Sequence, residues 1–241
     1  MAHEAYTREV PGADGAVLLI HGILGTPDHF RDLVPLVPDD WSVYNLLLDG
    51  HGGEVKDFSH TSMKKWRSQV HTKLTDLRQR HEKIILVGHS MGTLFAIDEA
   101  IRDPGKLEAL FLLQVPLRPW VRPKAALGAC LLPFGVVTGA NRDMQADCSL
   151  NLNPRLWEYL GWVPRFLELL ERCVDVRNRL DQLEVPCQVF VSKQDELVST
   201  RTCRDFRKHP HIRWYVLRNS GHFVYRGTDR EFLQSKFAAL F

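Results

Sequence analysis

The stretch Lys83-Ile84-Ile85-Leu86-Val87-Gly88-His89-Ser90-Met91-Gly92 decides the fold. An apolar, β-branched run leads into Gly88, and Ser90 sits between two glycines. A helical pattern then runs from residue 91 to about residue 102. This spacing predicts a strand, a sharp turn and a helix, with Ser90 at the apex in a strained backbone conformation with positive φ. The serine oxygen then stands at the carboxyl end of a strand, beside the first N–H groups of the helix.

A flexible serine turn is the alternative interpretation of this motif. Gly and Ser are common residues, so a bare G-x-S-x-G arises by chance in roughly one chain in ten of this length. The apolar strand before the motif and the helix after it reduce that chance. A nucleophilic serine also needs a base, an acid that orients the base, and an oxyanion hole. The rest of the chain therefore has to supply these groups.

Length and composition indicate one globular domain of ordinary character. The chain has 241 residues, of which 44% are hydrophobic and 25% charged, enough for one α/β core with an insertion. The net charge of +2 gives no indication of a nucleic acid or an anionic membrane as partner. No apolar run reaches the roughly 18 residues that a membrane span needs. No N-terminal pattern of a charged segment followed by an apolar run indicates secretion.

The five cysteines are odd in number and none are closely spaced. This pattern predicts reduced thiols in a cytoplasmic protein. Their spacing offers no zinc site, and the chain has no phosphate-binding P-loop. We therefore expect neither a metal nor a cofactor.

Strand and helix patterns alternate along most of the chain. Apart from the strand before Ser90, strands are expected at residues 6–10 (a short edge strand), 16–20, 41–48, 107–115, 187–192 and 212–217. Helices are expected at residues 28–37, 61–82, 91–102, 164–180 and 228–240, with a basic helical face at 201–208. This order predicts an α/β fold with a mostly parallel sheet and helices on both faces.

The alternation breaks between residue 117 and about residue 164. This region holds many prolines and no convincing strand, an apolar part at 125–137 that glycine and proline interrupt, and an aromatic part at 157–162. We interpret it as a small cap insertion over the carboxyl ends of the strands; irregular core packing is the alternative. The expected division is a core of residues 1–116 and 164–241 and a cap of residues 117–163.

A base and an acid for Ser90 should lie at the same edge of the sheet, because sites in open parallel sheets form at the carboxyl ends of the strands. His222 follows the last strand, whereas His209 and His211 precede it and should lie at the opposite edge. Asp195 follows the strand at 187–192, and the adjacent Glu196 is the fallback carboxylate. Four further histidines lie in the N-terminal tail, in a loop or on a helix surface, where we expect them to be solvated: His3, His60, His71 and His81.

These segments together resemble the α/β-hydrolase superfamily. The matching parts are His21-Gly22-Ile23-Leu24-Gly25, the Gly88–Gly92 motif, Asp195 after its strand, and Ser220-Gly221-His222. Within the superfamily, the chain is similar to small bacterial carboxylesterases and monoacylglycerol-lipase-like enzymes. The resemblance covers nearly the whole core but not the cap. One departure is the short N-terminus, which leaves room for one strand before the His-Gly strand where larger members have two.

The resemblance implies a role for each of these residues. Ser90 is the nucleophile, His222 the base, and Asp195 the acid that orients the imidazole. The backbone N–H groups of Met91 and Ile23 form the oxyanion hole.

The implied activity is a serine hydrolase that cleaves a small carboxylic ester with an apolar acyl or aryl part. Thioesterase, C–C hydrolase or amide hydrolase activity is the alternative, and a ligand-binding pseudoenzyme is a third hypothesis. His51, on the same sheet edge, either contacts substrate or makes a structural loop hydrogen bond. The apolar cap suggests a substrate pocket lined by Leu131, Phe134, Trp157 and Trp162. The sequence does not specify the oligomeric state.

Overall fold

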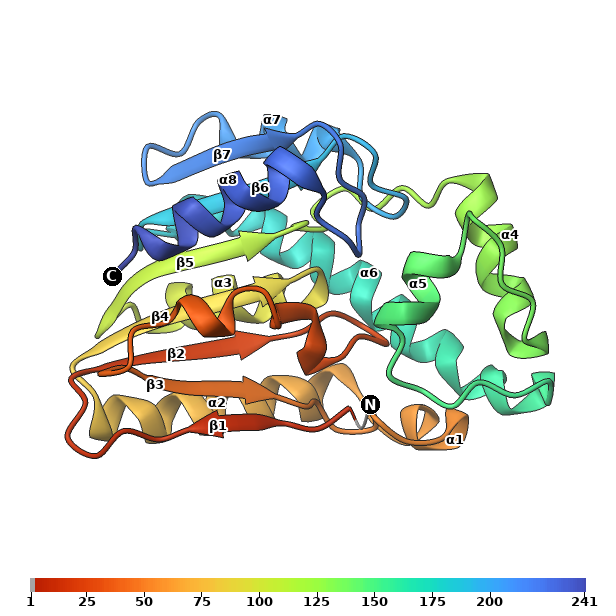
Figure 1. Cartoon of the computed structure of the whole chain (residues 1–241), viewed down its shortest axis with the longest axis horizontal. Helices are drawn as coiled ribbons and strands as arrows, with labels where there is room; N and C mark the ends of the chain where they lie inside the picture. The colour runs from red at the N-terminus through yellow and green to blue at the C-terminus, as the bar shows by residue number, and fades with distance from the viewer. Residues whose placement is uncertain (1–2) are drawn as a thin grey trace.

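A seven-stranded sheet forms the centre of the structure, in the order β1-β3-β2-β4-β5-β6-β7 (Figure 1). The computed structural model describes residues 3–241. Every neighbouring pair is parallel except β1, which pairs antiparallel with β3 at the edge. The predicted mostly parallel sheet with a short N-terminal edge strand is therefore confirmed. The strands are β1 (Tyr6–Arg8), β2 (Gly15–Ile20), β3 (Ser42–Leu46), β4 (Lys83–His89), β5 (Leu107–Leu113), β6 (Cys187–Ser192) and β7 (Ile212–Leu217).

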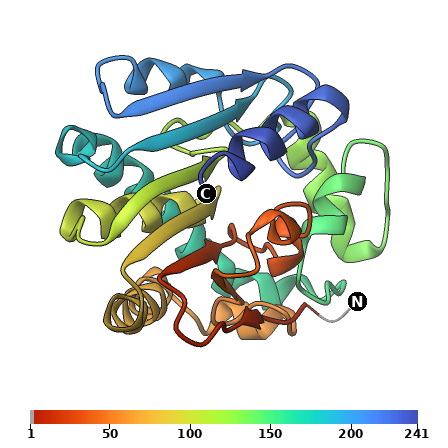
Figure 2. The ribbon, with the colours of Figure 1, turned by 60° about the vertical axis from the view of Figure 1, so that its left-hand side comes forward.

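Helices cover both faces of the twisted sheet (Figures 1 and 2). The α-helices are α1 (Val55–Ser59), α2 (Met63–Arg80), α3 (Met91–Arg102), α4 (Pro123–Leu131), α5 (Arg142–Asp147), α6 (Trp162–Asn178), α7 (Cys203–Phe206) and α8 (Gly227–Ala238). Along β2, Leu18 packs into the core under α2, α3 and α6, whereas Val17 and Leu19 pack into the core that includes Leu233 and Phe237 of α8. Both faces of the strand are buried, which explains its continuous apolar sequence.

The helix expected at residues 28–37 is absent. The structure has two 3-10 turns there, η1 (Pro27–Phe30) and η2 (Val34–Leu36). Pro35 explains the difference, because a proline inside a helix lacks the N–H for the ladder and its ring clashes with the carbonyl four residues earlier. The α6 helix starts at Trp162 rather than at residue 164, because Pro164 is tolerated in the first helical turn.

The segment of residues 117–163 lies beyond the carboxyl ends of the strands (Figure 1). It contains α4, α5 and two 3-10 turns, η3 (Leu132–Phe134) and η4 (Leu156–Gly161), and no named strand. Isolated bridges join Pro119 to Val198 and Asn151 to Glu54. The segment is thus bonded to the loops at this edge of the sheet.

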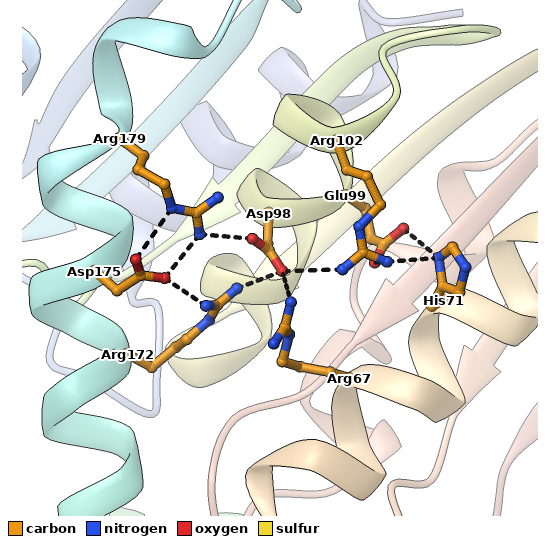
Figure 3. Close-up of polar contacts among 8 residues, drawn as sticks. All are labelled: Arg67, His71, Asp98, Glu99, Arg102, Arg172, Asp175 and Arg179. Atoms are coloured by element: carbon orange, nitrogen blue, oxygen red, sulfur yellow. Dashed lines mark hydrogen bonds and ion pairs between the residues drawn. The ribbon is translucent and has the colours of Figure 1, made fainter.

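A buried carboxylate joins three helices on one face of the sheet (Figure 3). Asp98 of α3 is 3% exposed and accepts from Arg67 of α2 at 2.9 Å and from Arg179, just after α6, at 2.7 Å. Arg172 of α6 also pairs with it. Burial by itself would raise the pKa of Asp98, but these guanidinium groups outweigh it and lower the pKa. Since α6 begins at the end of the 117–163 segment, this network fixes that end relative to the core.

Of the histidines expected to be solvated, His81 is buried, whereas the side chain of His71 remains 45% exposed. His81 is 4% exposed, and its Nδ1 lies 2.8 Å from the carbonyl oxygen of Ala13. His71 is half-buried, with Nδ1 2.9 Å from a carboxylate oxygen of Glu99 (Figure 3). The prediction was wrong for His81, because a histidine just after a helix can turn toward a neighbouring loop that the local pattern does not show.

Neither a membrane-spanning helix nor a disulfide occurs in residues 3–241. None of the described helices combines the length and apolar character that crossing a membrane requires. All five cysteines are free: Cys130, Cys148, Cys173, Cys187 and Cys203.

Candidate active site

Ser90 occupies a sharp turn between β4 and α3. Its backbone angles are φ 49° and ψ −119°, as the motif predicts. The flanking glycines permit this turn: a Cβ on Gly92 would lie 1.9 Å from the carbonyl oxygen of Ile20, and one on Gly88 would lie 2.7 Å from the backbone of Thr93. The Ser90 N–H donates to the carbonyl of Leu113 at 2.9 Å. The turn is therefore held in a conformation that a serine alone would avoid.

His222 and Asp195 meet at the carboxyl edge of the sheet. His222 Nδ1 lies 2.9 Å from Asp195 Oδ2, and both residues are nearly buried, at 2% and 3% exposure. The other oxygen of Asp195, Oδ1, accepts from the N–H groups of Leu197 and Val198 at 2.7 Å and 2.6 Å. The carboxylate is thus oriented by its own loop while it holds one nitrogen of the imidazole.

The environment of His222 favours its protonated form. Burial by itself would lower the pKa of His222, but the charge of Asp195 and its hydrogen bond outweigh that effect. The charges of Glu196 and Asp147 raise the pKa further. The pKa of His222 is therefore raised from its ordinary value of 6.5. An imidazole that gains a proton readily suits a general base.

The predicted oxyanion loop lies next to Ser90. A Cβ on Gly22 would lie 3.0 Å from the Cβ of Ser90. Within residues 3–241, the backbone N–H groups of Ile23 and Met91 donate to no protein acceptor, whereas the N–H of Leu24 is bonded. Two free N–H groups on the segments that flank the serine are the arrangement an oxyanion hole needs.

His51 supports this loop through its ring nitrogens. Its Nε2 accepts from the N–H of Leu24 at 3.1 Å, and its Nδ1 lies 3.2 Å from the carbonyl oxygens of both Leu48 and Asp49. Burial lowers the pKa of His51 to about 4, so the ring is neutral at physiological pH. Because both ring nitrogens are used, the structural alternative predicted for His51 fits better than substrate contact.

The four apolar residues expected to line a pocket differ widely in their exposure. Phe134 and Trp157 are exposed, at 53% and 69%, and Leu131 is half-buried. Trp162 is buried against α1, where its ring packs at 5.0 Å from that of Phe58. A closed apolar pocket formed by this set is thus not present in the structure. The sequence pattern identified apolar side chains but could not give their directions.

A polar cavity of about 210 Å³ lies between η1, α5 and the loop after His222. Its lining includes His29 and Asp147, whose Nδ1 and Oδ1 atoms are 2.9 Å apart. His29, His89 and Asp147 hold metal-ligand atoms within 4.8 Å of one another. However, the two imidazoles are stacked, with centroids 3.6 Å and planes 20° apart, so their lone pairs lie in two separate, nearly parallel planes. Two histidines on one metal need converging lone pairs, and we interpret the cluster as a hydrogen-bonded stack.

The strained serine, the buried His–Asp pair and the free N–H groups stand on a parallel sheet in the order that the sequence predicted. The sequence profile of the Alpha/beta hydrolase family matches residues 17–234. The chain belongs to this family.

Several known proteins are similar to this chain. A thermostable monoacylglycerol lipase from Bacillus sp. (strain H-257) is 27% identical over 76% of this chain and 71% of the relative. A carboxylesterase from Bacillus subtilis (strain 168) is 22% identical over 91% of this chain and 89% of the relative. A solved structure from a study of two metagenome-derived lipolytic enzymes, LipS and LipT, superposes with a TM-score of 0.77 at 19% identity, covering 99% of this chain and 97% of that chain.

The sequence search for site residues missed Gln114. Gln114 directly follows β5, is fully buried and has φ 56°. Its side chain bonds to Ser192 at the end of β6, just before the loop with Asp195, and to Gly221, next to His222. The available signal was a polar residue at the carboxyl end of a strand, but only histidines and carboxylates were sought there.

Proposed function

We propose that this α/β hydrolase cleaves small carboxylic esters through an acyl-enzyme formed on Ser90. The observation that carries the proposal is the 2.9 Å contact between His222 Nδ1 and Asp195 Oδ2 at the sheet edge where Ser90 occupies its strained turn. Three groups from three strand ends then have the roles of nucleophile, base and orienting acid.

In the first half of the reaction, the Ser90 oxygen attacks the ester carbonyl while Nε2 of His222 takes the hydroxyl proton. The hydrogen bond to Asp195 keeps the proton on Nδ1, which leaves Nε2 free to accept. The resulting imidazolium is stabilised by the carboxylate. The C–O bond to the alcohol then breaks, and the proton moves from Nε2 to the leaving alcohol.

The negative charge that develops on the carbonyl oxygen needs donors at fixed positions. The N–H groups of Ile23 and Met91 supply them, since neither is used within the described residues. The Ile23 donor is fixed because the next residue, Leu24, is bonded on both sides: its N–H to His51 and its carbonyl to the N–H of Ser149 at 2.9 Å. Removing one donor of an oxyanion hole typically costs about 10²–10³ in kcat.

In the second half, water attacks the acyl carbon with His222 again as the base. The serine–acyl bond breaks, the carboxylic acid is released, and Ser90 recovers its proton. No metal or cofactor enters this scheme.

The substrate is an ester with an apolar acyl or aryl part, and residues 117–163 act as a cap over the site. The segment is rich in exposed apolar side chains, including Leu127, Phe134 and Trp157. Ser90 is only 7% exposed, so an ester approaches it through the region that this cap borders. The lipase and carboxylesterase names of the relatives support this substrate class.

A cytoplasmic location is part of the same proposal. Five free cysteines, three of them buried, suit a reducing compartment. Burial raises the pKa of Cys187 and, to about 12, that of Cys173; such thiols are structural rather than reactive.

A fluorophosphonate probe and a panel of substrates test the function. Only an activated serine reacts with the probe, so labelling of Ser90 separates a hydrolase from a ligand-binding protein on the same fold. Turnover of p-nitrophenyl esters of graded chain length, compared with acyl-CoA thioesters and p-nitroanilides, then distinguishes ester hydrolysis from thioester or amide hydrolysis. Absence of labelling, or preference for thioesters, would contradict the proposal.

A further inference from the structure

Three side chains outside the triad hold the backbone on either side of His222. Glu196 Oε2 accepts from the N–H of His222 at 2.7 Å. Gln114 Nε2 donates to the carbonyl of Gly221 at 3.2 Å. His89 Nε2 lies 3.0 Å from the carbonyl oxygen of His222. Both peptide groups that flank the His222 Cα are therefore bonded to side chains from other strand ends.

Glu196 is well placed to fix this backbone. Its own carbonyl accepts from the N–H of Arg122 at 2.8 Å, so its main chain is attached to the start of the 117–163 segment. Its carboxylate lies against Gly221, where an added Cβ would be 2.8 Å from Oε1. The bond to His222 combines a carboxylate with a backbone N–H, a charge-assisted pair that is stronger than a neutral one.

Gln114 joins the acid loop to the base loop. Its Oε1 accepts from the N–H of Ser192 at 2.8 Å, at the end of β6, while its Nε2 reaches Gly221. The residue is fully buried and has a left-handed backbone, φ 56°. Such strain in a residue other than glycine persists only where surrounding contacts enforce it, and here the enforced conformation aims the amide between the two catalytic loops.

We propose that Glu196, together with Gln114, is a positioning residue for His222 in the reaction proposed above. Asp195 holds one ring nitrogen and thereby sets the orientation of the imidazole. Glu196 and Gln114 hold the backbone from which that ring extends, and so set the distance of Nε2 from the Ser90 oxygen. Positioning matters because a displacement of about 1 Å can cost about 10²-fold in rate.

Glu196 also acts on His222 through its charge. The groups facing His222 are Asp195 and Glu196 from the loop after β6, Asp147 from α5 and His89 from β4. Burial has the largest effect and lowers the pKa of His222, whereas Asp195 raises it most. The charge of the Glu196 carboxylate raises this pKa further. The variant Glu196→Gln separates the effect of the hydrogen bond from that of the charge, because its amide keeps an acceptor oxygen but carries no charge.

The test compares Glu196→Gln, Glu196→Ala and Gln114→Met by steady-state kinetics on p-nitrophenyl butyrate across pH, with the exposed Glu184→Gln as control. Glu196→Gln is expected to keep most of kcat while the acid limb of kcat/KM moves to lower pH, because less stabilisation of the imidazolium lowers the pKa of the base. Glu196→Ala is expected to lower kcat by up to about 100-fold with KM nearly unchanged. Gln114→Met should lower kcat in the same way, and Glu184→Gln should match wild type.

Each outcome bears on one idea. If wild type is not labelled by a fluorophosphonate, or if Ser90→Ala still turns over ester, the proposed function itself fails. If wild type is labelled and active but Glu196→Ala keeps normal kcat and Glu196→Gln keeps the wild-type pH profile, the positioning role alone is rejected. If Glu196→Ala does not fold, Gln114→Met and Glu196→Gln decide together, and a wild-type kcat in the first with an unmoved acid limb in the second overturns the proposal.

Discussion

The indole N–H of Trp162 donates to the backbone carbonyl of Val55 at 2.9 Å, across 107 residues of sequence. Trp162 begins α6 and Val55 begins α1, so this bond joins the end of the 117–163 segment to the core. The Trp162 ring also packs against Phe58 and Tyr159, with centroids 5.0 Å and 4.7 Å away. Trp162 is therefore a structural contact between the two parts of the chain.

Trp162→Phe should destabilise the protein, whereas Trp157→Phe should not. The first change removes the indole N–H that donates to the carbonyl of Val55, and a hydrogen bond of this kind contributes about 0.5–1.5 kcal/mol. Trp157 is 69% exposed, and exposed positions usually change stability by less than about 0.5 kcal/mol. Thermal denaturation of both variants measures the difference, and equal melting temperatures would contradict it. A changed ester chain-length preference in Trp157→Phe alone would support a place for Trp157 near the substrate path.

Ser90→Ala should abolish ester turnover and fluorophosphonate labelling while leaving the fold intact. Removing a catalytic serine lowers kcat by about 10⁶ in serine proteases. Activity, labelling detected by mass spectrometry, and circular dichroism together make the measurement. Ser68→Ala, at an exposed position of α2, is the matched control and should behave as wild type. Labelling at a different serine in the Ser90→Ala variant would show that the nucleophile is misassigned.

Asp195→Asn should lower kcat by up to about 10⁴ near neutral pH. The amide keeps the size of the side chain but favours the wrong tautomer of His222, so Nε2 no longer accepts the serine proton. Because the effect is on the transition state, kcat and kcat/KM should fall together while substrate binding changes little. Steady-state kinetics check this. If Asp195→Asn lowers kcat only slightly and Glu196→Gln is nearly inactive, Glu196 rather than Asp195 is the orienting acid.

Ester hydrolysis should decline as the pH falls through the pKa of His222. The base works only when Nε2 is unprotonated, and the net effect of Asp195 over burial raises the pKa of His222 from the ordinary value of 6.5. The acid limb of kcat/KM should therefore lie above pH 6.5, and Asp195→Asn should move it lower. A pH–rate profile with a neutral ester measures this limb. An acid limb of kcat/KM below pH 6.5 in the wild-type protein would be inconsistent with the contacts described for His222.

Gly92→Ala should prevent correct folding of the serine turn. A Cβ there would lie 1.9 Å from the carbonyl oxygen of Ile20, far inside contact distance and against backbone that cannot move without shifting β2. Gly139→Ala is the control, since nothing lies within 4 Å of the added Cβ and its φ is not in the left-handed region. Soluble yield and denaturation midpoints compare the two, and a Gly92→Ala variant as stable as Gly139→Ala would contradict the described turn.

Chain order alone predicted much of the candidate site. Ser90, Asp195 and His222 each follow a strand, and in a parallel sheet all strands end at one edge, so the sequence placed them together before any contact was known. The strained backbone at Ser90 was also predictable, because Gly88 and Gly92 on either side leave room for a turn that side chains would block.

Local sequence patterns were less reliable where a single residue disrupts the regular spacing of its neighbours. Residues 28–37 have helical spacing of apolar side chains, but Pro35 interrupts the ladder of helical hydrogen bonds and the chain forms two short 3-10 turns instead. His81 looked like a surface residue at the end of a helix, yet it turns inward to the carbonyl of Ala13.

The sequence by itself determined the order of most strands and helices and the sheet edge at which Ser90, Asp195 and His222 lie, because these follow from local periodicity and from the geometry of parallel strands. Only the tertiary structure decided that Asp195 holds the imidazole while Glu196 holds the backbone of the same histidine. It also decided that Gln114 joins the two catalytic loops and that Trp162 supports the fold rather than lining a pocket. These contacts join side chains to groups 26 to 107 residues away, and their directions depend on how whole elements pack.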